Sequence, residues 1–135
     1  MSRVALVTGG TRGIGEAICN ALQARGYTVI ANYAGNDASA AEFSKRTGIP
    51  VYKFDVSDFE ATRAKIGEIE AKHGPVEVLV NNAGITRDRT MHRMDPLQWK
   101  QVIETNLGSC FNTCHAVING MRERKFGRIV NIGSI

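Results

Sequence analysis

A glycine-rich turn near the N-terminus constrains the fold of this chain more than any other feature of its sequence. The turn, Thr8 to Gly15 (TGGTRGIG), follows the unbroken apolar run Val4 to Val7 and leads into a helical pattern from Gly13 to Arg25. Such an apolar run is typical of a strand that is buried on both faces of a parallel sheet. Glycines in the turn let a phosphate group approach the main chain, where the N–H groups and the dipole of the helix favour negative charge. The turn therefore predicts a nucleotide site at the start of an α/β domain.

The alternation of strand and helix continues along the rest of the chain. A capping box of Ser57 and Glu60 is expected to begin a third helix, and the pair Asp95-Pro96 a long fourth one. The predicted strands are 4–7, 28–33, 51–54, 76–80 and 128–132. The first two predicted helices are 13–25 and 38–46, and the long fourth helix is 95–121. Five strands separated by four helices predict right-handed crossovers and a doubly wound parallel sheet. Because no linker-like composition divides the chain, we expect a single domain over residues 1–135.

Charge, composition and cysteine content disfavour several classes of protein. The net charge is +4 and the basic residues are spread along the chain, which favours a solvated surface over a nucleic-acid interface. No apolar stretch is long enough for a membrane span or placed as a signal peptide, so we expect a cytoplasmic protein without a membrane partner. Three cysteines then predict reduced thiols. Cys110 and Cys114 are interpreted as core residues of one helix face and not as metal ligands.

The residues around the turn narrow the class of nucleotide. A P-loop is excluded because Glu16 and Ala17 stand where it requires lysine and serine or threonine. An NAD site usually places a carboxylate about 20 residues after the turn to accept hydrogen bonds from the adenine ribose. Here the second predicted strand ends in 32–36 without an acid, and the first carboxylate is Asp37. With Arg12 available as a positive partner for a 2′-phosphate, the sequence predicts NADPH.

Five motifs in this order resemble the short-chain dehydrogenase/reductase family, over all 135 residues, which implies a Rossmann fold. They are the glycine-rich turn, Asp55-Val56, Asn81-Asn82-Ala83-Gly84, Asn106 in the long helix, and Ser134 after the fifth strand. Segments 1–11, 33–36, 85–88 and 126–132 most resemble bacterial NADPH-dependent acetoacetyl-CoA reductases of polyhydroxybutyrate synthesis. The 3-oxoacyl-carrier-protein reductases of fatty-acid synthesis come next. The resemblance thus implies an oxidoreductase that reduces a 3-oxoacyl thioester of CoA or of a carrier protein.

The resemblance also implies cofactor contacts for individual residues. The glycine-rich turn would cradle the pyrophosphate and 2′-phosphate, and the end of the second strand would flank the adenine ribose. Residues after the third strand would surround the adenine ring, and residues after the fourth strand would line the rest of the cofactor. In this order the residues are Gly9, Arg12, Gly13, Ile14 and Gly15; Tyr33 and Ala34; Asp55 and Val56; and Asn82, Ala83, Gly84, Ile85 and Thr86.

For the substrate, the resemblance implies that Ser134 binds the carbonyl to be reduced, that Asn106 holds a water in a proton relay, and that Asp88 lies near the thioester. Arg89, Arg93, Arg124 and Lys125 are candidates for the carrier's phosphates, although a solvated basic surface explains them nearly as well. The family's tetramers use the long helix. Helix 95–121 carries more apolar residues than one sheet face needs, so we expect a homo-oligomer through it.

One part of the family's chemistry has no counterpart in these 135 residues. The family uses a tyrosine as general acid and a lysine four residues later that lowers the tyrosine pKa. The tyrosines here are Tyr27, Tyr33 and Tyr52, and none has a lysine at that spacing. We therefore expect an N-terminal portion of a longer reductase, truncated after the fifth strand and inactive alone. The alternative is a naturally short, non-catalytic nucleotide-binding or dimerising module.

Overall fold

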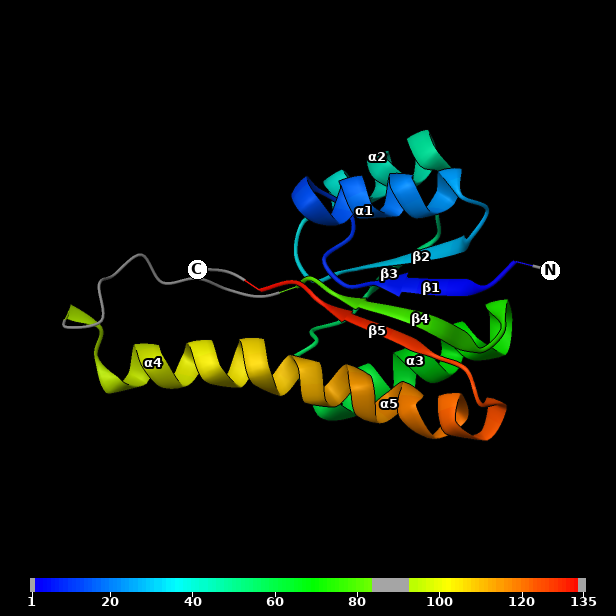
Figure 1. Ribbon diagram of the computed structural model, residues 1–135. Helices are drawn as coiled ribbons and strands as arrows, with labels where there is room; N and C mark the ends of the chain where they lie inside the picture. Colours follow the sequence, from blue (N-terminus) through cyan, green and yellow to red (C-terminus); the bar gives the residue numbers. More distant parts are fainter. Residues whose placement is uncertain (1, 84–92, 134–135) are drawn as a thin grey trace.

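The computed structural model describes residues 2–83 and 93–133, which form a five-stranded parallel sheet covered by helices on both faces (Figure 1). The strand order is β3-β2-β1-β4-β5, with every neighbouring pair parallel. The strands are β1 (Val4–Val7), β2 (Thr28–Tyr33), β3 (Val51–Lys53), β4 (Val76–Asn81) and β5 (Arg128–Asn131). The helices are α1 (Gly13–Ala24), α2 (Asp37–Thr47), α3 (Phe59–His73), α4 (Pro96–Val102) and α5 (Gly108–Arg124). The predicted doubly wound α/β architecture is confirmed.

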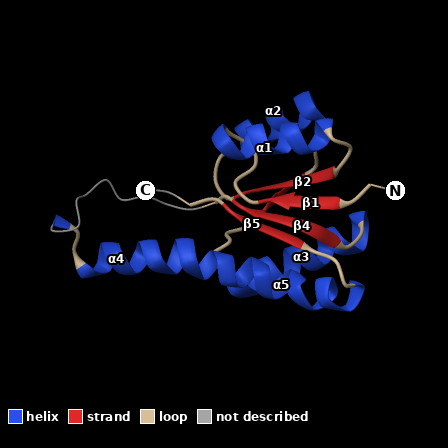
Figure 2. Ribbon diagram, viewed as in Figure 1, coloured by secondary structure: helices blue, strands red, loops and turns tan. Residues whose placement is uncertain are grey.

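Two apolar layers hold the helices against the sheet. Helices α1 and α2 cover one face, and α3 and α5 cover the other (Figures 1 and 2). Successive residues of β1 point to opposite faces, and none of its side chains is more than 4% exposed. Ala5 and Val7 pack with Cys19 of α1 and Phe43 of α2. On the other face the cluster comprises Val4, Leu6, Ile30, Phe54, Val56, Ile66, Ile69, Val76, Leu79, Val117 and Met121. Burial on both faces explains why β1 is an unbroken apolar run.

The prediction for the start of the third helix was wrong by one residue. Asp58, not Ser57, is the N-cap of α3, and its carboxylate accepts a hydrogen bond of 3.0 Å from the Ala61 N–H. The Ser57 hydroxyl instead donates to the carboxylate of Asp55 at 2.7 Å. Two capping residues compete here, and the carboxylate next to the first helical residue wins because it reaches the free N–H groups directly.

The long helix begins as predicted but is not regular. Asp95 and Gln98 form a capping box, with hydrogen bonds of 2.8 and 3.1 Å between each side chain and the other residue's N–H. A π-helical turn, Ile103–Leu107, then separates α4 from α5. The chain leaves α5 only after Arg124, where Lys125 adopts a left-handed conformation with φ of 57°. The prediction of one uninterrupted helix over 95–121 was therefore wrong in the middle and short at its end.

The long helix carries more apolar side chains than its sheet-facing side buries, as expected from its sequence. The side of α5 that is buried on the sheet carries Ser109, Asn112 and Thr113 beside the apolar Val117 and Met121. Cys110 and Cys114 are only half-buried, although Cys114 packs against the core. Several large apolar residues form an exposed stripe, each 38–65% accessible: Trp99, Ile103, Leu107, Phe111 and Ile118. Within the described residues, no helix is both long and apolar enough to cross a bilayer.

Candidate functional site

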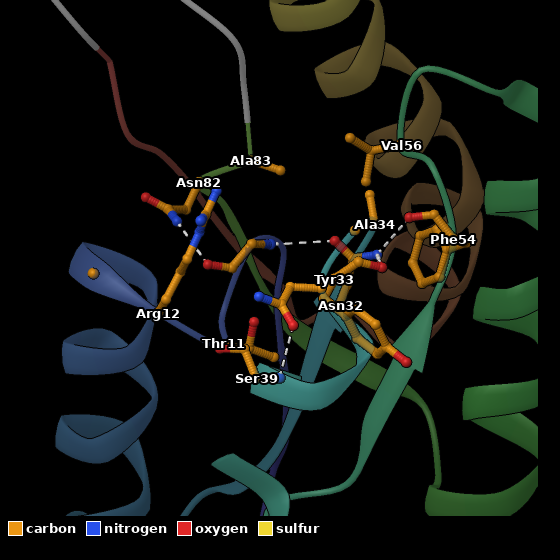
Figure 3. A pocket seen from close by; sticks show the side chains of 14 residues that line it. Thr11, Arg12, Asn32, Tyr33, Ala34, Ser39, Phe54, Val56, Asn82 and Ala83 are labelled. Carbon is orange, nitrogen blue, oxygen red and sulfur yellow. Dashed lines mark hydrogen bonds between the residues drawn. The ribbon is translucent and has the colours of Figure 1, made fainter. Parts of the chain in front are cut away.

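The main pocket lies at the carboxyl edge of the sheet, where open α/β sheets bind ligands (Figure 3). It has a volume of about 420 Å³. Four segments form its walls: the glycine-rich turn after β1, the connection from β2 into α2, the residues after β3, and those after β4. The lining residues are Gly9, Thr11, Arg12, Gly13, Asn32, Tyr33, Ala34, Gly35, Asn36, Ser39, Phe54, Val56, Asn82 and Ala83.

Most of the residues predicted from sequence to contact a cofactor meet at this pocket. Those that line it are Gly9, Arg12, Gly13, Tyr33, Ala34, Val56, Asn82 and Ala83. Three others do not: Ile14 is 66% exposed at the helix start, Gly15 packs beneath the turn, and the Asp55 carboxylate binds Ser57. Gly84, Ile85, Thr86, Asp88, Arg89 and Ser134 lie outside the described residues.

The glycine-rich turn has a backbone that other residues do not easily adopt. Gly9 and Gly13 have φ values of 61° and 58°, in the left-handed region that glycine tolerates. A Cβ on Gly15 would lie 2.0 Å from the carbonyl oxygen of Gly9, so α1 can sit this close to the turn only without a side chain there. Arg12 occupies the N-cap position without a side-chain cap among the described residues. The first N–H groups of α1 are thus placed to bind an anion at the pocket.

Two buried polar residues that sequence reasoning missed hold this turn in place. The Asn32 side chain accepts a hydrogen bond of 3.2 Å from the Gly9 N–H and donates one of 2.9 Å to the Phe54 carbonyl (Figure 3). The Thr8 hydroxyl accepts from the N–H groups of Asn82 and Ala83 at 2.9 and 3.0 Å. Both residues are at most 2% exposed. The signal in the sequence was a polar residue at the end of an otherwise apolar strand, which is costly to bury unless it is bonded.

The carboxylate in the first turn of α2 is paired with a lysine and a tyrosine. Asp37, the first acid after β2, accepts hydrogen bonds from the Tyr33 hydroxyl at 3.0 Å and from the Lys53 ammonium at 3.2 Å. These bonds, first that from Lys53 and then that from Tyr33, hold the pKa of Asp37 below its usual value. The pKa of Tyr33 is raised, first by partial desolvation and then by its bond to Asp37. Asp37 itself does not line the pocket.

A buried thiol lies directly behind the turn. The Sγ of Cys19 on α1 donates to the Gly10 carbonyl at 3.5 Å and is fully buried. Burial, reinforced by the charge of Glu16, raises the pKa of Cys19 to about 12. The thiol therefore stays protonated at neutral pH and acts as a small packing group, not as a nucleophile.

The remaining candidates lie away from this pocket. Asn106 is in the π turn of the long helix, on the sheet face opposite α1, and the hydroxyl of Ser109 donates to its carbonyl oxygen at 3.2 Å. Arg124 donates to the Val76 carbonyl at the amino end of β4, so Arg124 and the adjacent Lys125 lie at the opposite edge of the sheet from the pocket. Arg93 is exposed. Among the described residues, no group of three or more His, Cys, Asp or Glu side chains is arranged to hold a metal ion.

Comparison with known proteins gives consistent matches over the whole chain. The family pattern described as short chain dehydrogenase matches residues 3–135. Acetoacetyl-CoA reductases of Rhizobium meliloti and Paracoccus denitrificans are 62% and 60% identical over 135 residues, covering 100% of this chain and 56% of each relative. A 3-oxoacyl-[acyl-carrier-protein] reductase of Vibrio harveyi is 41% identical over 98% of this chain and 55% of that protein. The chain thus spans about half the length of these curated relatives.

The fold also matches a solved structure. A short-chain dehydrogenase from Streptomyces avermitilis superposes with a TM-score of 0.90 at 30% sequence identity. The match covers 98% of this chain and 49% of that one. The arrangement of strands and helices around the pocket is therefore the one seen in that structure.

Replacing Gly15 with alanine tests the packing of α1 against the turn. The added Cβ would meet main chain, which cannot rotate aside as a flexible side chain can. We expect the free energy of unfolding to fall by about 2 kcal/mol. We expect dinucleotide affinity, measured by fluorescence titration, to fall at least tenfold, which corresponds to a loss of about 1.4 kcal/mol of binding free energy. Gly67→Ala is the matched control, since nothing lies within 4 Å of that position in α3. It should raise the free energy of unfolding by about 0.5–1 kcal/mol; unchanged affinity in Gly15→Ala contradicts this packing role.

Proposed function

The chain belongs to the short-chain dehydrogenase family of oxidoreductases, and from that premise we propose that it forms the cofactor-binding part of an NADPH-dependent 3-oxoacyl thioester reductase. The proposed reaction reduces acetoacetyl-CoA to 3-hydroxybutanoyl-CoA for polyhydroxybutyrate synthesis. The observation that carries this proposal is the identity of 60–62% with acetoacetyl-CoA reductases along all 135 residues. A cytoplasmic location, with reduced thiols, is part of the same proposal.

The pocket has the chemistry that a phosphorylated dinucleotide needs. The start of α1 and the glycine backbone of the turn supply N–H groups for the pyrophosphate. Phe54 and Val56 offer apolar surface for the adenine, and Tyr33 and Ala34 flank its ribose. Asn82 and Ala83 continue the wall toward the nicotinamide end, where we assign Gly84, Ile85 and Thr86 as well. Bound NADPH supplies a hydride; every other step depends on groups of the protein.

The preference for NADPH over NADH rests on charge. A 2′-phosphate needs a positive partner and the absence of a nearby free carboxylate. Arg12 lines the pocket, and Asn36 and Ser39 add polar groups at the start of α2. Asp37, the first acid after β2, is held by Lys53 and Tyr33. The negative charge that would repel a 2′-phosphate is thereby balanced.

We propose the following roles for the catalytic groups. Ser134 binds the carbonyl oxygen of the substrate, Asn106 holds a water in the proton relay, and Asp88 lies beside the thioester. A tyrosine that protonates this oxygen, and a lysine that lowers its pKa, are needed in addition, so these 135 residues alone bind the cofactor without turnover. Sequencing the gene beyond the codon for Ile135 tests this directly: Tyr-x-x-x-Lys there supports the reductase, whereas a stop codon favours a non-catalytic nucleotide-binding module.

The exposed stripe on the long helix supports self-association. Trp99, Ile103, Leu107, Phe111 and Ile118 present large apolar groups to solvent. Phe111 also stacks on Phe59 of α3 at 6.2 Å between ring centroids, which widens the apolar surface. An exposed patch of this kind marks an interface. We propose a homotetramer in which helix 95–121 packs against the same helix of another subunit.

Turnover by the full-length gene product distinguishes the candidate functions. We expect NADPH oxidation to be faster with acetoacetyl-CoA than with the acetoacetyl carrier protein. The absorbance of the reduced nicotinamide follows the reaction. A reversed order of kcat/KM supports the carrier-protein reductase, whose Vibrio harveyi relative is 41% identical. Saturable NADPH binding without turnover on either thioester supports the non-catalytic module and rejects both reductases.

Arg12→Leu tests the cofactor preference. Loss of a charge-assisted hydrogen bond to phosphate costs about 1.5–3 kcal/mol, so we expect NADPH affinity to fall about 10- to 100-fold while NADH affinity stays unchanged. Arg25→Leu, at the exposed C-terminal end of the same helix, is the control and should change neither. Fluorescence titration with both cofactors is the measurement. An equal loss of affinity for NADPH and NADH means that Arg12 does not read the 2′-phosphate.

Phe111→Glu tests the proposed interface. Phe111 is 61% exposed, so the charge is tolerated in the isolated subunit but not in a tightly packed apolar contact. We expect light scattering after gel filtration to show a tetramer for the wild type and smaller species for the variant, with unchanged circular dichroism. Ala41→Glu, on the exposed side of α2, should remain tetrameric. A monomeric wild type is incompatible with the proposal.

A further inference from the structure

The long helix departs from regular geometry at the residue we assign to the proton relay. Asn106 lies within the π turn Ile103–Leu107, where the Gly108 N–H bonds to the Ile103 carbonyl, five residues back. A π turn widens the helix and interrupts the regular ladder, and such turns are frequent at functional sites. The position of the Asn106 backbone therefore depends on contacts beyond the ordinary helical hydrogen bonds.

One such contact is a buried side chain of the same helix. Ser109 is 3% exposed, and its hydroxyl donates to the carbonyl oxygen of Asn106 at 3.2 Å. Because the bond is partly buried, it is worth more than it would be on the open surface. Ser109 thus ties the C-terminal side of the π turn to the first turn of α5.

Thr113, one helical turn further along the same buried side, connects α5 to the sheet. Its hydroxyl donates to the side-chain oxygen of Asn81 at 2.6 Å, and the carbonyl of Ser109 lies 3.0 Å from the same hydroxyl. The amide of Asn81 donates in turn to the side chain of Asn131 at 2.9 Å. Thr113 therefore ties α5, the helix that follows the π turn, to the ends of β4 and β5.

These buried polar groups do more than fill space between α5 and the sheet. The helix has large apolar residues available, yet Leu107 and Phe111 are exposed while Ser109 and Thr113 are buried. Burying hydroxyl groups is unfavourable unless each is bonded, and no buried side-chain nitrogen or oxygen among the described residues lacks a partner. Fully bonded buried polar groups rigidify a core and specify one arrangement of its elements. In the sequence, Asn131, the last residue of β5, precedes Ser134 by three positions.

We propose that Ser109 and Thr113 are positioning residues of the reductase. Together with Asn81 they hold the π turn, and thus Asn106, in a fixed relation to the strand that leads to Ser134. This inference rests on the proposed function, because it assigns Asn106 and Ser134 to one catalytic set.

The test uses the full-length gene product with Ser109→Ala. We expect kcat for acetoacetyl-CoA reduction to fall about 10- to 100-fold, since small displacements of a catalytic group cost rates of this order. NADPH affinity and the KM for acetoacetyl-CoA should stay within about twofold of the wild type. Ser109→Thr keeps the hydroxyl and should restore most of kcat. Thr113→Val should lower kcat in the same direction, and Thr113→Ser should rescue it.

Ser44→Ala is the matched control for the loss of a partly buried hydroxyl. Its side chain donates to the Ile49 carbonyl at 2.7 Å at the far end of α2, away from the long helix. It should lose a similar amount of stability with an unchanged kcat. The proposal is overturned if the kcat of Ser109→Ala stays within about twofold of the wild-type kcat, or if it is no lower than the kcat of Ser44→Ala.

Amide hydrogen exchange separates failure of this inference from failure of the proposed function. If the wild type reduces neither thioester, the proposed function fails, and exchange at residues 103–110 then decides the positioning role. Faster exchange there in Ser109→Ala than in Ser44→Ala supports a hydroxyl that holds the π turn, and equal exchange in the two variants rejects it.

Discussion

The backbone contact between Gly15 and the carbonyl of Gly9 determines where the other parts of the pocket lie. It leaves no room for a side chain, so the first turn of α1 stands directly above the end of β1. That placement aims the helix N-terminus into the pocket. Burial of β1 between two apolar layers keeps the strand, and hence the turn, from shifting. The arrangement that we propose for binding phosphate thus follows from the way one helix packs on one strand.

A row of buried polar residues joins this turn to its neighbours at the same edge of the sheet. Thr8 directly follows β1, Asn32 lies in β2 and Asn81 ends β4, and each is at most 6% exposed. Thr8 and Asn32 bind the backbone of the turn and of the residues after β4. Asn81 faces the other layer, where it binds Thr113 of α5. The interior of the sheet is apolar, but its carboxyl edge is a bonded polar rim that connects the cofactor side to the helix of Asn106.

The elements predicted from sequence are those whose cause is local. Apolar runs such as Val4–Val7 and the turn after them indicate strand and helix by residue type alone, and the structure contains both. What residue types alone do not show depends on partners distant in sequence or on competition between neighbours. Asp58, not Ser57, caps α3. Ser57 binds the Asp55 carboxylate, and Lys53 pairs with Asp37 from 16 positions away. No pattern of residue types marks a π turn, because its cause is an extra residue accommodated in the hydrogen-bond ladder.

The π turn also changes the geometry of the exposed stripe. Trp99, Ile103, Leu107 and Phe111 follow each other at intervals of four, and in a regular helix each such step advances the side chain about 40° around the axis. Three steps would wind the stripe through about 120°, out of reach of a straight partner. A π turn rotates less per residue, so the segment Ile103–Leu107 turns the stripe back toward its starting direction. The irregularity beside Asn106 therefore also brings these apolar groups closer to one line along the helix than a regular helix would.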